Sequence, residues 1–370
     1  MLAYFEVQGF KNFDQPVSLD LRNVRDYQFN EKCVKNGLVH NAILYGKNSV
    51  GKTNFGLALF DVVSHLTSNN VSPGLYDYYL STKNGKGTAR FRYVFRFGTD
   101  EVEYEYEKEA PKKLLSERLS INGEQFLLKN YDSPEKDDFS GVRQLAPTLN
   151  YSFEQDGSVL RYVLNNTALE KTHPLYRMMR FVSNMLWARC LEENRYIGYR
   201  NDSSNFFTFL LRDPAAFEAF QELLSRAGVE LTLHIEEDPD GKARLYAAPA
   251  DDPTARLPFY RTASSGTKAL YTYFYWKTTA PEASLFFLDE FDAFYHFELA
   301  ETLQKELQEF PCQVIVTSHN TNLLSNRIMR PDCYFILTPG KLVSFSQATR
   351  RELREGHNLE KLFMSGEFDG

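Results

Sequence analysis

The sequence predicts a mixed α/β fold in which a buried strand leads into a phosphate-binding loop, and three observations support this prediction. Residues 41–45 are a short, mostly apolar run that ends at a G-x-x-x-x-G-K-[ST] pattern, residues 46–53. Residues 89–107 alternate aromatic or aliphatic side chains with charged ones, as a half-buried antiparallel hairpin does. The apolar runs 284–288 and 313–317 each stop at polar residues, as buried strands do.

The remaining elements follow from the same local patterns. Apolar residues at helical spacing predict helices, period-two alternation predicts strands, and Asn-Gly at 122–123 predicts a turn. We find no internal repeat and no heptad run long enough for a long coiled coil. In chain order we expect strands at 3–8 and 17–21, a helix at 52–65, hairpins from 89 to 129, an exposed loop at 131–141, a mostly helical stretch at 158–226, strands at 229–235 and 243–248, helices at 268–277 and 297–309, and a hairpin at 333–345.

Composition limits the class of protein. Hydrophobic residues make up 43% and charged residues 25% of the 370 residues, so we expect a packed, soluble chain. The net charge of -7 argues against indiscriminate nucleic-acid binding. No apolar run of about 18 residues predicts a membrane span, and the first residues read as a strand and not as a signal peptide. The four cysteines form no C-x-x-C pair, which fits a reducing cytoplasm.

The loop at 46–53 indicates nucleotide binding through its backbone. Gly46 and Gly51 permit the tight turn, and successive N–H groups then point at phosphate oxygens. Lys52 is expected to reach the β and γ phosphates, and the Thr53 hydroxyl to hold Mg²⁺. The helix that follows adds its positive N-terminal end. ATP with Mg²⁺ is therefore the expected cofactor.

Three further stretches have both a functional and an ordinary interpretation. Asp289 and Glu290 follow a buried strand, so they are candidates to hold Mg²⁺ and to polarise the attacking water, or else they cap a helix. Ser264 and Gly266 precede a helical run and form either an anion site or a plain helix cap. His319 follows a buried strand and either contacts a γ phosphate or is an ordinary loop histidine.

These stretches, in this order, resemble the ATP-binding-cassette (ABC) type of ATPase, in its soluble branch with RecF, SMC proteins and OLD-type nucleases. The spacing fits, with 25 positions from Ser264 to Asp289 and 30 from Asp289 to His319. The "DEFDAFYH" stretch looks closest to that of the compact ATPases of bacterial anti-phage systems, which are known as AAA-family proteins. The resemblance implies an ABC-type P-loop ATPase head with an antiparallel β lobe and a helical insertion, without a long coiled coil. The domains expected are an N-terminal ATPase lobe at 1–150, the insertion at 151–228 and a C-terminal ATPase lobe at 229–370.

The resemblance also implies roles for particular residues. The phosphate loop looks like the family's G-x-N-x-x-G-K-[ST]-N form, "ASSGTK" looks like the signature motif, and His319 matches the switch histidine. No glutamine can be assigned to the loop that links the lobes, Gln144 and Gln155 being the only candidates. The implied nucleotide-binding residues are Lys11, Gly46, Asn48, Gly51, Lys52, Thr53, Asn54, Ser264, Gly266 and Asp292, with Thr53 and Asp289 on the metal and Glu290 and His319 catalytic.

In such a mechanism two chains share each ATP. One chain binds it through Lys52 and Thr53, and Ser264 and Gly266 of a second chain cap the γ phosphate, so ATP joins a homodimer, or a higher oligomer built from it. Asp292 is expected to cross the dimer interface. Glu290 then drives hydrolysis and the dimer loosens.

Three functions remain open from the sequence. The first is a sensor or regulator in anti-phage defence that controls a separate nuclease or toxin, because about fifty residues follow His319, too few for the extra catalytic domain of OLD-type proteins. The second is a RecF-like or SMC-like DNA-repair ATPase that grips duplex DNA. A transporter subunit is the third, and the long middle segment speaks against it. Duplex DNA would be bound by arginines of the middle segment, unless these are solvated or paired with acids such as Glu192 and Glu193. The arginines in question are at positions 177, 180, 189, 195 and 200.

An effector would need a docking surface. The candidates are the tail 350–370 and the aromatic residues of the middle segment, although about half of these aromatics should be buried in the core. The aromatic candidates are Tyr176, Phe181, Trp187, Tyr196, Tyr199, Phe206 and Phe207.

Overall fold

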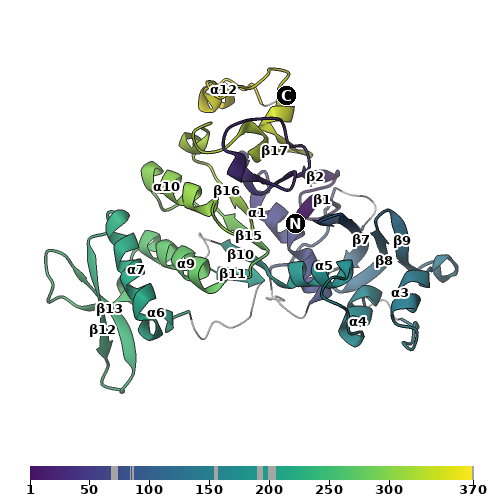
Figure 1. Cartoon of the computed structure of the whole chain (residues 1–370), viewed down its shortest axis with the longest axis horizontal. Helices are drawn as coiled ribbons and strands as arrows, with labels where there is room; N and C mark the ends of the chain where they lie inside the picture. The colour runs from purple at the N-terminus through teal and green to yellow at the C-terminus, as the bar shows by residue number, and fades with distance from the viewer. Residues whose placement is uncertain are drawn as a thin grey trace.

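The computed structural model describes residues 1–67, 74–83, 85, 87–153, 157–189, 195–198 and 206–368. Two large sheets meet around the segment that carries the phosphate loop, and helices cover them (Figure 1). One large hydrophobic core runs through both sheets. This mixed α/β architecture is the predicted one, and the longest described helix has 15 residues, so none of the described helices forms a long coiled coil.

The first sheet is antiparallel and has six strands, in the order β2-β1-β6-β7-β8-β9. Its aromatic side chains point into the main core at alternate positions, so Phe91, Tyr93 and Phe95 are buried there. Arg92 and Val94 lie on the other face, where a small second cluster covers Val94. This alternation confirms the predicted hairpin, with one face on the core. The strands are β1 (Leu2–Gln8), β2 (Val17–Asp20), β6 (Ala89–Phe97), β7 (Asp100–Ala110), β8 (Lys113–Ile121) and β9 (Glu124–Asn130).

The second sheet has seven strands, in the order β11-β10-β15-β16-β5-β17-β18. Its five inner strands run parallel, and the edge strands β11 and β18 run antiparallel to them. Buried parallel strands end at a common edge, and loops at that edge form ligand sites. The strands are β5 (Asn41–Tyr45), β10 (Met185–Arg189), β11 (Arg195–Gly198), β15 (Leu285–Asp289), β16 (Gln313–Thr317), β17 (Tyr334–Thr338) and β18 (Lys341–Ser344).

Smaller elements complete the fold. A three-stranded sheet, β12 (Leu231–Glu237), β13 (Ala243–Pro249) and β14 (Leu257–Pro258), stands with α7 at one end of the molecule (Figure 1). Strands β3 (Val34–Lys35) and β4 (Leu38–Val39) form a short ribbon. The helices are α1 (Lys52–Leu59), α2 (Asp61–Leu66), α3 (Ser140–Leu145), α4 (Val159–Asn166), α5 (Pro174–Ser183), α6 (Phe209–Arg212), α7 (Pro214–Arg226), α8 (Phe259–Thr262), α9 (Ser265–Thr279), α10 (Phe297–Leu307), α11 (Phe345–Ala348) and α12 (Leu359–Met364).

The stretch 158–226, predicted to be mostly helical, also contains strands β10 and β11. The helix α5 ends at Ser183, and the next residues pair with β15 in the middle of the large sheet. A strand buried on both faces has no alternation, so its apolar run is indistinguishable from a buried helix in the sequence. The predicted insertion therefore contributes strands β10 and β11 to the seven-stranded sheet.

The predicted docking surfaces are covered only in part, because most of the described tail residues are exposed. Among the aromatic candidates Phe181 and Trp187 lie in the core, whereas Phe207 is 56% exposed, and residues 196 and 199 lie outside the side chains that the structure describes. In the tail, the Phe345 and Phe368 rings stack at 4.1 Å, so the tail packs on its own chain. Burial of part of the aromatic set was expected, and the docking role of the exposed residues stays a prediction.

The described residues bear on the predictions about membrane spans and cysteines. None of the helices described above is long and apolar enough to cross a membrane. Cys33, Cys312 and Cys333 are free and buried, and Cys190 lies outside the described residues.

Candidate functional site

The phosphate loop joins the central strand β5 to helix α1. Gly51 adopts φ +108° and Ser49 φ +63°, two left-handed conformations in a tight loop. A Cβ on Gly51 would lie 2.4 Å from the Asn12 side chain, so only glycine fits at this point. Gly56, one turn into α1, would bring a Cβ within 3.0 Å of Phe287 and Trp187. The absence of side chains at both glycines therefore lets the loop and α1 lie close against the core.

Lys52 projects across the mouth of this loop. Its Nζ lies 3.1 Å from the Gly46 carbonyl oxygen and 2.6 Å from His319 Nε2. Burial lowers the Lys52 pKa, whereas the nearby Glu290, Asp289 and Asp292 charges oppose this change. The pKa of His319 is lowered too, first by burial and then by the Lys52 charge. The ammonium thus faces a neutral imidazole, and negative phosphate oxygens would stabilise it further.

Thr53 and Asp289 meet from opposite sides of the site. Thr53 Oγ1 donates a 2.8 Å hydrogen bond to Asp289 Oδ2, and Thr317 Oγ1 donates one of 2.8 Å to Asp289 Oδ1. Burial raises the Asp289 pKa, although these two hydrogen bonds oppose the rise. A hydroxyl and a partly desolvated carboxylate are suitable ligands for Mg²⁺, whose positive charge would offset the cost of burying the carboxylate. The residues present therefore fit the expected cation.

Glu290 is held in an unusual backbone conformation. Its φ is +54°, which costs a residue with a Cβ about 1–2 kcal/mol. The Glu290 amide donates to Thr317 Oγ1 at 2.7 Å, and its Oε1 lies 3.8 Å from His319 Nε2. Strain of this kind is tolerated mainly at functional sites. The Glu290 carboxylate is partly exposed and faces the histidine, which is suitable for a group that orients water.

Lys11 does not reach the phosphate loop. Its Nζ donates a 2.7 Å hydrogen bond to the Asp77 carbonyl oxygen, and its φ is +48°. The next residue, Asn12, lies against the loop, where its Nδ2 donates to the Val50 carbonyl at 2.9 Å. Asn54, predicted at the site, donates to Asn12 Oδ1 at 2.7 Å. Asn12 therefore braces the loop, and the predicted phosphate contact of Lys11 stays a prediction.

The remaining residue of the predicted loop, Asn48, is exposed at the tip. Ser264 lies on the surface as the N-cap of α9, where its hydroxyl accepts a 3.1 Å hydrogen bond from the Thr267 amide. A Cβ on Gly266 would lie 3.2 Å from the Phe294 carbonyl oxygen, so the start of α9 abuts the turn after Glu290. Among the contacts found for the described residues, neither Ser264 nor Gly266 touches the phosphate loop of the same chain.

Asp292 is largely buried within this chain. Its residue is only 9% exposed, and its carboxylate accepts hydrogen bonds from the Ser318 and Asn320 side chains of the same chain. Burial raises the Asp292 pKa, and these hydrogen bonds oppose the rise. Within this chain Asp292 therefore braces the loop that carries His319, and its expected place at a dimer interface stays a prediction.

Sequence reasoning missed three residues at the site. Asn12 follows the predicted Lys11 by one position, and Thr317 precedes Ser318–His319, so both had a local signal. Arg189 had none, because its strand β10 was read as helix, yet it stands opposite Asp289 in the sheet register. The Arg189 charge partly opposes the rise in the Asp289 pKa.

No glutamine takes the lobe-linking position among the residues described. Gln144 belongs to the short helix α3, which contacts β9 of the antiparallel sheet, and Gln155 lies outside the described residues. The strand next to β15 ends instead at the buried Arg189.

Comparison with known proteins gives one family match. Residues 42–325 match the family described as "AAA domain, putative AbiEii toxin, Type IV TA system". No curated protein sequence matches the chain. The matched range includes the phosphate loop, Ser264, Asp289, Glu290 and His319.

Solved structures of SMC head domains are also similar. The head domain from Thermotoga maritima is 13% identical over 93% of this chain and 97% of its own, with a TM-score of 0.42. The head from Pyrococcus yayanosii, which includes a coiled coil and joint, is 12% identical over 98% and 99%, with a TM-score of 0.48. The head from Pyrococcus furiosus, bound to the C-terminal domain of ScpA, is 14% identical over 98% of both chains, with a TM-score of 0.43.

Proposed function

Because the chain belongs to the AAA domain family described as "putative AbiEii toxin, Type IV TA system", we propose that it hydrolyses ATP with Mg²⁺ to control a separate effector in bacterial anti-phage defence. The effector we infer is a nuclease or another toxin. The observation that carries the ATPase part is the convergence of Lys52, Asp289 and His319 on one phosphate loop. The family description supports the defence part, since a toxin–antitoxin system has two components.

The geometry supports a specific division of roles. Lys52 and the loop amides hold the phosphates, and Thr53 with Asp289 holds Mg²⁺, which when bound neutralises charge on the phosphates. Thr317 positions two of these groups, because its hydroxyl contacts both the Asp289 carboxylate and the Glu290 amide. Glu290 orients the attacking water and accepts its proton.

His319 has a hydrogen-bonding role in this scheme. It is neutral while Lys52 lies 2.6 Å away, so it can donate a hydrogen bond to a phosphate oxygen or accept one from water. Its neighbour Asp292 orients the loop through Ser318. The histidine can therefore respond to the presence of the terminal phosphate and pass the change to its loop.

We further propose that the active form is a homodimer in which ATP lies between two chains. Ser264 and Gly266 are accessible at the N-terminus of the 15-residue helix α9, away from their own phosphate loop. A helix N-terminus attracts anions, so this end of α9 is suited to cap a γ phosphate held by the second chain. Two chains would then sandwich two nucleotides.

The alternative, a protein that grips duplex DNA, has less support from the arginines that suggested it. Arg177 lies 3.6 Å from Asp100 and donates to the Phe97 carbonyl, and Arg189 is buried beside Asp289. Arg180 is exposed, and the side chains of residues 195 and 200 lie outside the described part of the chain. The described members of the set thus do not form one basic surface.

Co-expression with the neighbouring gene tests the proposal. We expect an effector to co-purify with the chain, and its toxicity to be lost with Lys52→Ala or Glu290→Gln. Lys113→Ala is the control, because this lysine pairs with Glu109 on the surface. If the chain instead carries no partner and binds duplex DNA in the ATP state, with affinity falling steeply in salt, the DNA-binding alternative replaces this proposal.

A further inference from the structure

A second cavity lies in the N-terminal lobe, outside the ATP site. It measures ≈ 610 Å³ and is bordered by α2, the turn between β7 and β8, and the start of α4. This volume is within the range of small-molecule sites, about 300–1,000 Å³. The polar side chains that line the cavity include those of Ser64, His65, Lys108, Lys112, Arg161 and Tyr162. None of them belongs to the nucleotide site.

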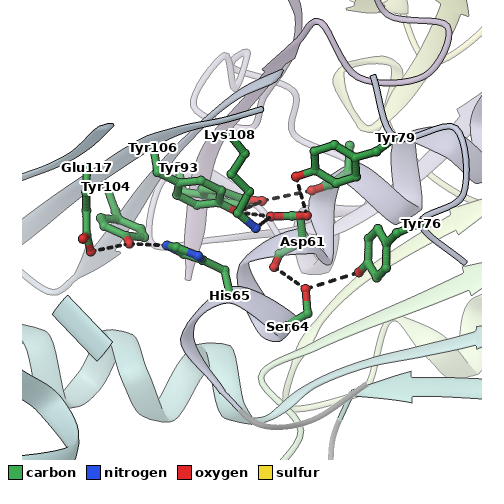
Figure 2. Close-up of polar contacts among 11 residues, drawn as sticks. Asp61, Ser64, His65, Tyr76, Tyr79, Tyr93, Tyr104, Tyr106, Lys108 and Glu117 are labelled. Carbon is green, nitrogen blue, oxygen red and sulfur yellow. Dashed lines mark hydrogen bonds and ion pairs between the residues drawn. The ribbon is translucent and has the colours of Figure 1, made fainter. Parts of the chain in front are cut away.

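One wall of the cavity is a buried ion pair. Lys108 Nζ lies 2.5 Å from Asp61 Oδ1, and the two side chains are 3% and 1% exposed. Tyr106 and Tyr79 also donate to the Asp61 carboxylate, at 2.7 and 2.9 Å (Figure 2). The Asp61 carboxylate therefore accepts three hydrogen bonds from within the protein. Its negative charge is neutralised locally and does not repel an anion in the cavity.

His65 stands beside this pair in a defined tautomer. Tyr104 donates its only proton to Glu117 Oε1 at 2.7 Å, so its oxygen must accept from His65 Nε2, which is 2.7 Å away (Figure 2). Burial, Lys108 and Arg161 all lower the His65 pKa. His65 is consequently neutral, with its proton on Nε2 and an acceptor lone pair on Nδ1. A ligand hydroxyl or amino group has a hydrogen-bond acceptor on this side of the cavity.

Glu117 satisfies the start of helix α4. Its carboxylate accepts hydrogen bonds from Ser158 Oγ at 2.6 Å and from the amides of Val159 and Leu160 at 2.8 and 3.1 Å. These donors are therefore not available to an incoming anion. Any anion in the cavity must be recognised by cationic side chains instead.

Those cationic side chains are present. The described lining contains Lys108, Lys112 and Arg161 and a single acid, Asp61, which is already paired. Lys112 is exposed in the turn between β7 and β8, and Arg161 projects from α4 on the facing side. Lys112 and Arg161 line the cavity from two different elements, together with tyrosine and serine side chains, and such a lining matches a phosphate group attached to a polar body.

We propose that this cavity binds a phosphate-bearing small molecule, with Lys112 and Arg161 on the phosphate and His65 on a hydroxyl or amino group of its body. The cavity is bounded on three sides by secondary structure, which favours a small molecule over a nucleic-acid strand. This site is independent of the proposed ATPase activity. Its wall is nevertheless continuous with the phosphate-loop helix, since only Phe60 separates α1 from α2.

Histidine NMR tests the proposal with inorganic phosphate and 5′-AMP as probes. The protein is the full chain carrying Lys52→Ala, which weakens binding at the phosphate loop. We expect the His65 signals to move on addition of either probe while the His319 signals stay, because His65 reports this cavity and His319 the ATP site. Movement confined to His319 would overturn the proposal. Failure of ATP hydrolysis in the wild-type chain would not affect this result.

Charge reversal identifies the contacts. In the same background, Lys112→Glu and Arg161→Glu should each weaken binding of 5′-AMP by about tenfold or more, as for loss of a charge-assisted contact. Lys113→Glu is the matched control, because the adjacent lysine pairs with Glu109, and should change affinity less than about twofold. Equal affinities in Lys112→Glu and Lys113→Glu would overturn the proposal. So would binding of a 5′-phosphorylated oligonucleotide with no response to the two small probes.

Discussion

Lys52 Nζ and His319 Nε2 lie 2.6 Å apart, so the lysine of the phosphate loop donates its hydrogen bond to the histidine that ends the neighbouring strand. The two groups cannot both be positively charged at this distance without strong repulsion. The lowered pKa of each is consistent with a charged lysine beside a neutral histidine. This relationship gives the first two predictions.

Lys52→Ala should abolish measurable ATP binding and leave the fold intact. Burial lowers the pKa of the ammonium, so removing it takes a desolvation cost away, and the nearby Asp289 keeps its hydrogen bonds from Thr53 and Thr317. Calorimetry should show affinity reduced by about 100-fold or more, as for loss of a charge-assisted phosphate contact. Unchanged affinity would remove the basis of the nucleotide site.

Binding of ATP should take up a proton near neutral pH. The His319 pKa is lowered in the free chain, and phosphate charge placed beside it would raise that pKa. Between the free and the bound pKa the complex holds more protons, so affinity should increase as pH falls from about 7 to about 6. Calorimetry in buffers of different ionisation enthalpy measures the uptake. His319→Asn should abolish it, and proton release by the wild-type chain would contradict the assignment.

Glu290→Gln should trap an ATP-bound dimer. The substitution keeps the size of the side chain but removes the base, so hydrolysis should fall by about 100-fold or more while ATP still binds. Size-exclusion chromatography with light scattering should then show a dimer only when ATP and Mg²⁺ are present.

A second substitution tests the geometry of that dimer. Ser264→Arg adds bulk and charge at the exposed start of α9 and should prevent dimer formation in the Glu290→Gln background. Ser265→Ala, one position further and also exposed, serves as the control for a change at the same helix end. Normal turnover by Glu290→Gln would show that another group acts as the base.

Asp289→Asn should stabilise the ligand-free chain at neutral pH. Burial raises the pKa of Asp289 in the folded chain above its value in the unfolded chain. The protonated carboxyl therefore contributes to stability below the unfolded pKa, and this contribution is lost as the pH rises through the folded pKa. At pH 7 the charged form therefore destabilises the fold, and Asn should recover on the order of 1 kcal/mol.

The pH and ligand dependence make this prediction specific. In thermal unfolding the extra stability of Asp289→Asn over the wild type should shrink as pH falls toward about 4, where the wild-type acid also becomes neutral. With Mg²⁺ and ATP the wild type should be the more stable of the two, because only the wild type gains stability from binding. The exposed Asp251→Asn should show neither effect. A wild type more stable than Asp289→Asn without ligand would contradict the argument.

Much of the site was predictable because its residues are adjacent along the chain to strong local signals. Lys52 and Thr53 lie between a buried strand and a helix, and Asp289 ends the next buried strand, so strand order alone brings them to one edge of the sheet. The contact of Asn12 with the loop was not predicted, because the positive φ of Lys11 turns the chain at this point and places Asn12 against the loop. A left-handed residue that is not glycine has no reliable signal in one sequence.

The partners of the buried charges were not predictable. Alternation along β7 and β8 places Lys108 on the face of Val102, Tyr104 and Tyr106, and Glu117 on the face of Leu119, so these charged residues are 2% and 0% exposed. Lys108 finds Asp61, which is 47 positions away, and Glu117 finds the start of α4, which is 41 positions away. Such pairs depend on tertiary packing of separate segments, which local patterns do not contain.

Lys108→Met should destabilise the N-terminal lobe strongly. The substitution leaves the Asp61 carboxylate 1% exposed without its cation, although Tyr79 and Tyr106 still donate to it. Breaking a buried pair in this way costs about 3–5 kcal/mol, and the two remaining hydrogen bonds favour the lower end.

The Asp61→Asn/Lys108→Met double variant removes both charges and should be more stable than Lys108→Met alone. Urea unfolding of the wild type, the two single variants and the double variant gives the coupling energy. Lys113→Met, which breaks a pair whose side chains are 42% and 46% exposed, should cost less than about 1 kcal/mol. If Lys108→Met were no worse than Lys113→Met, the buried pair would not be what holds α2 against β7.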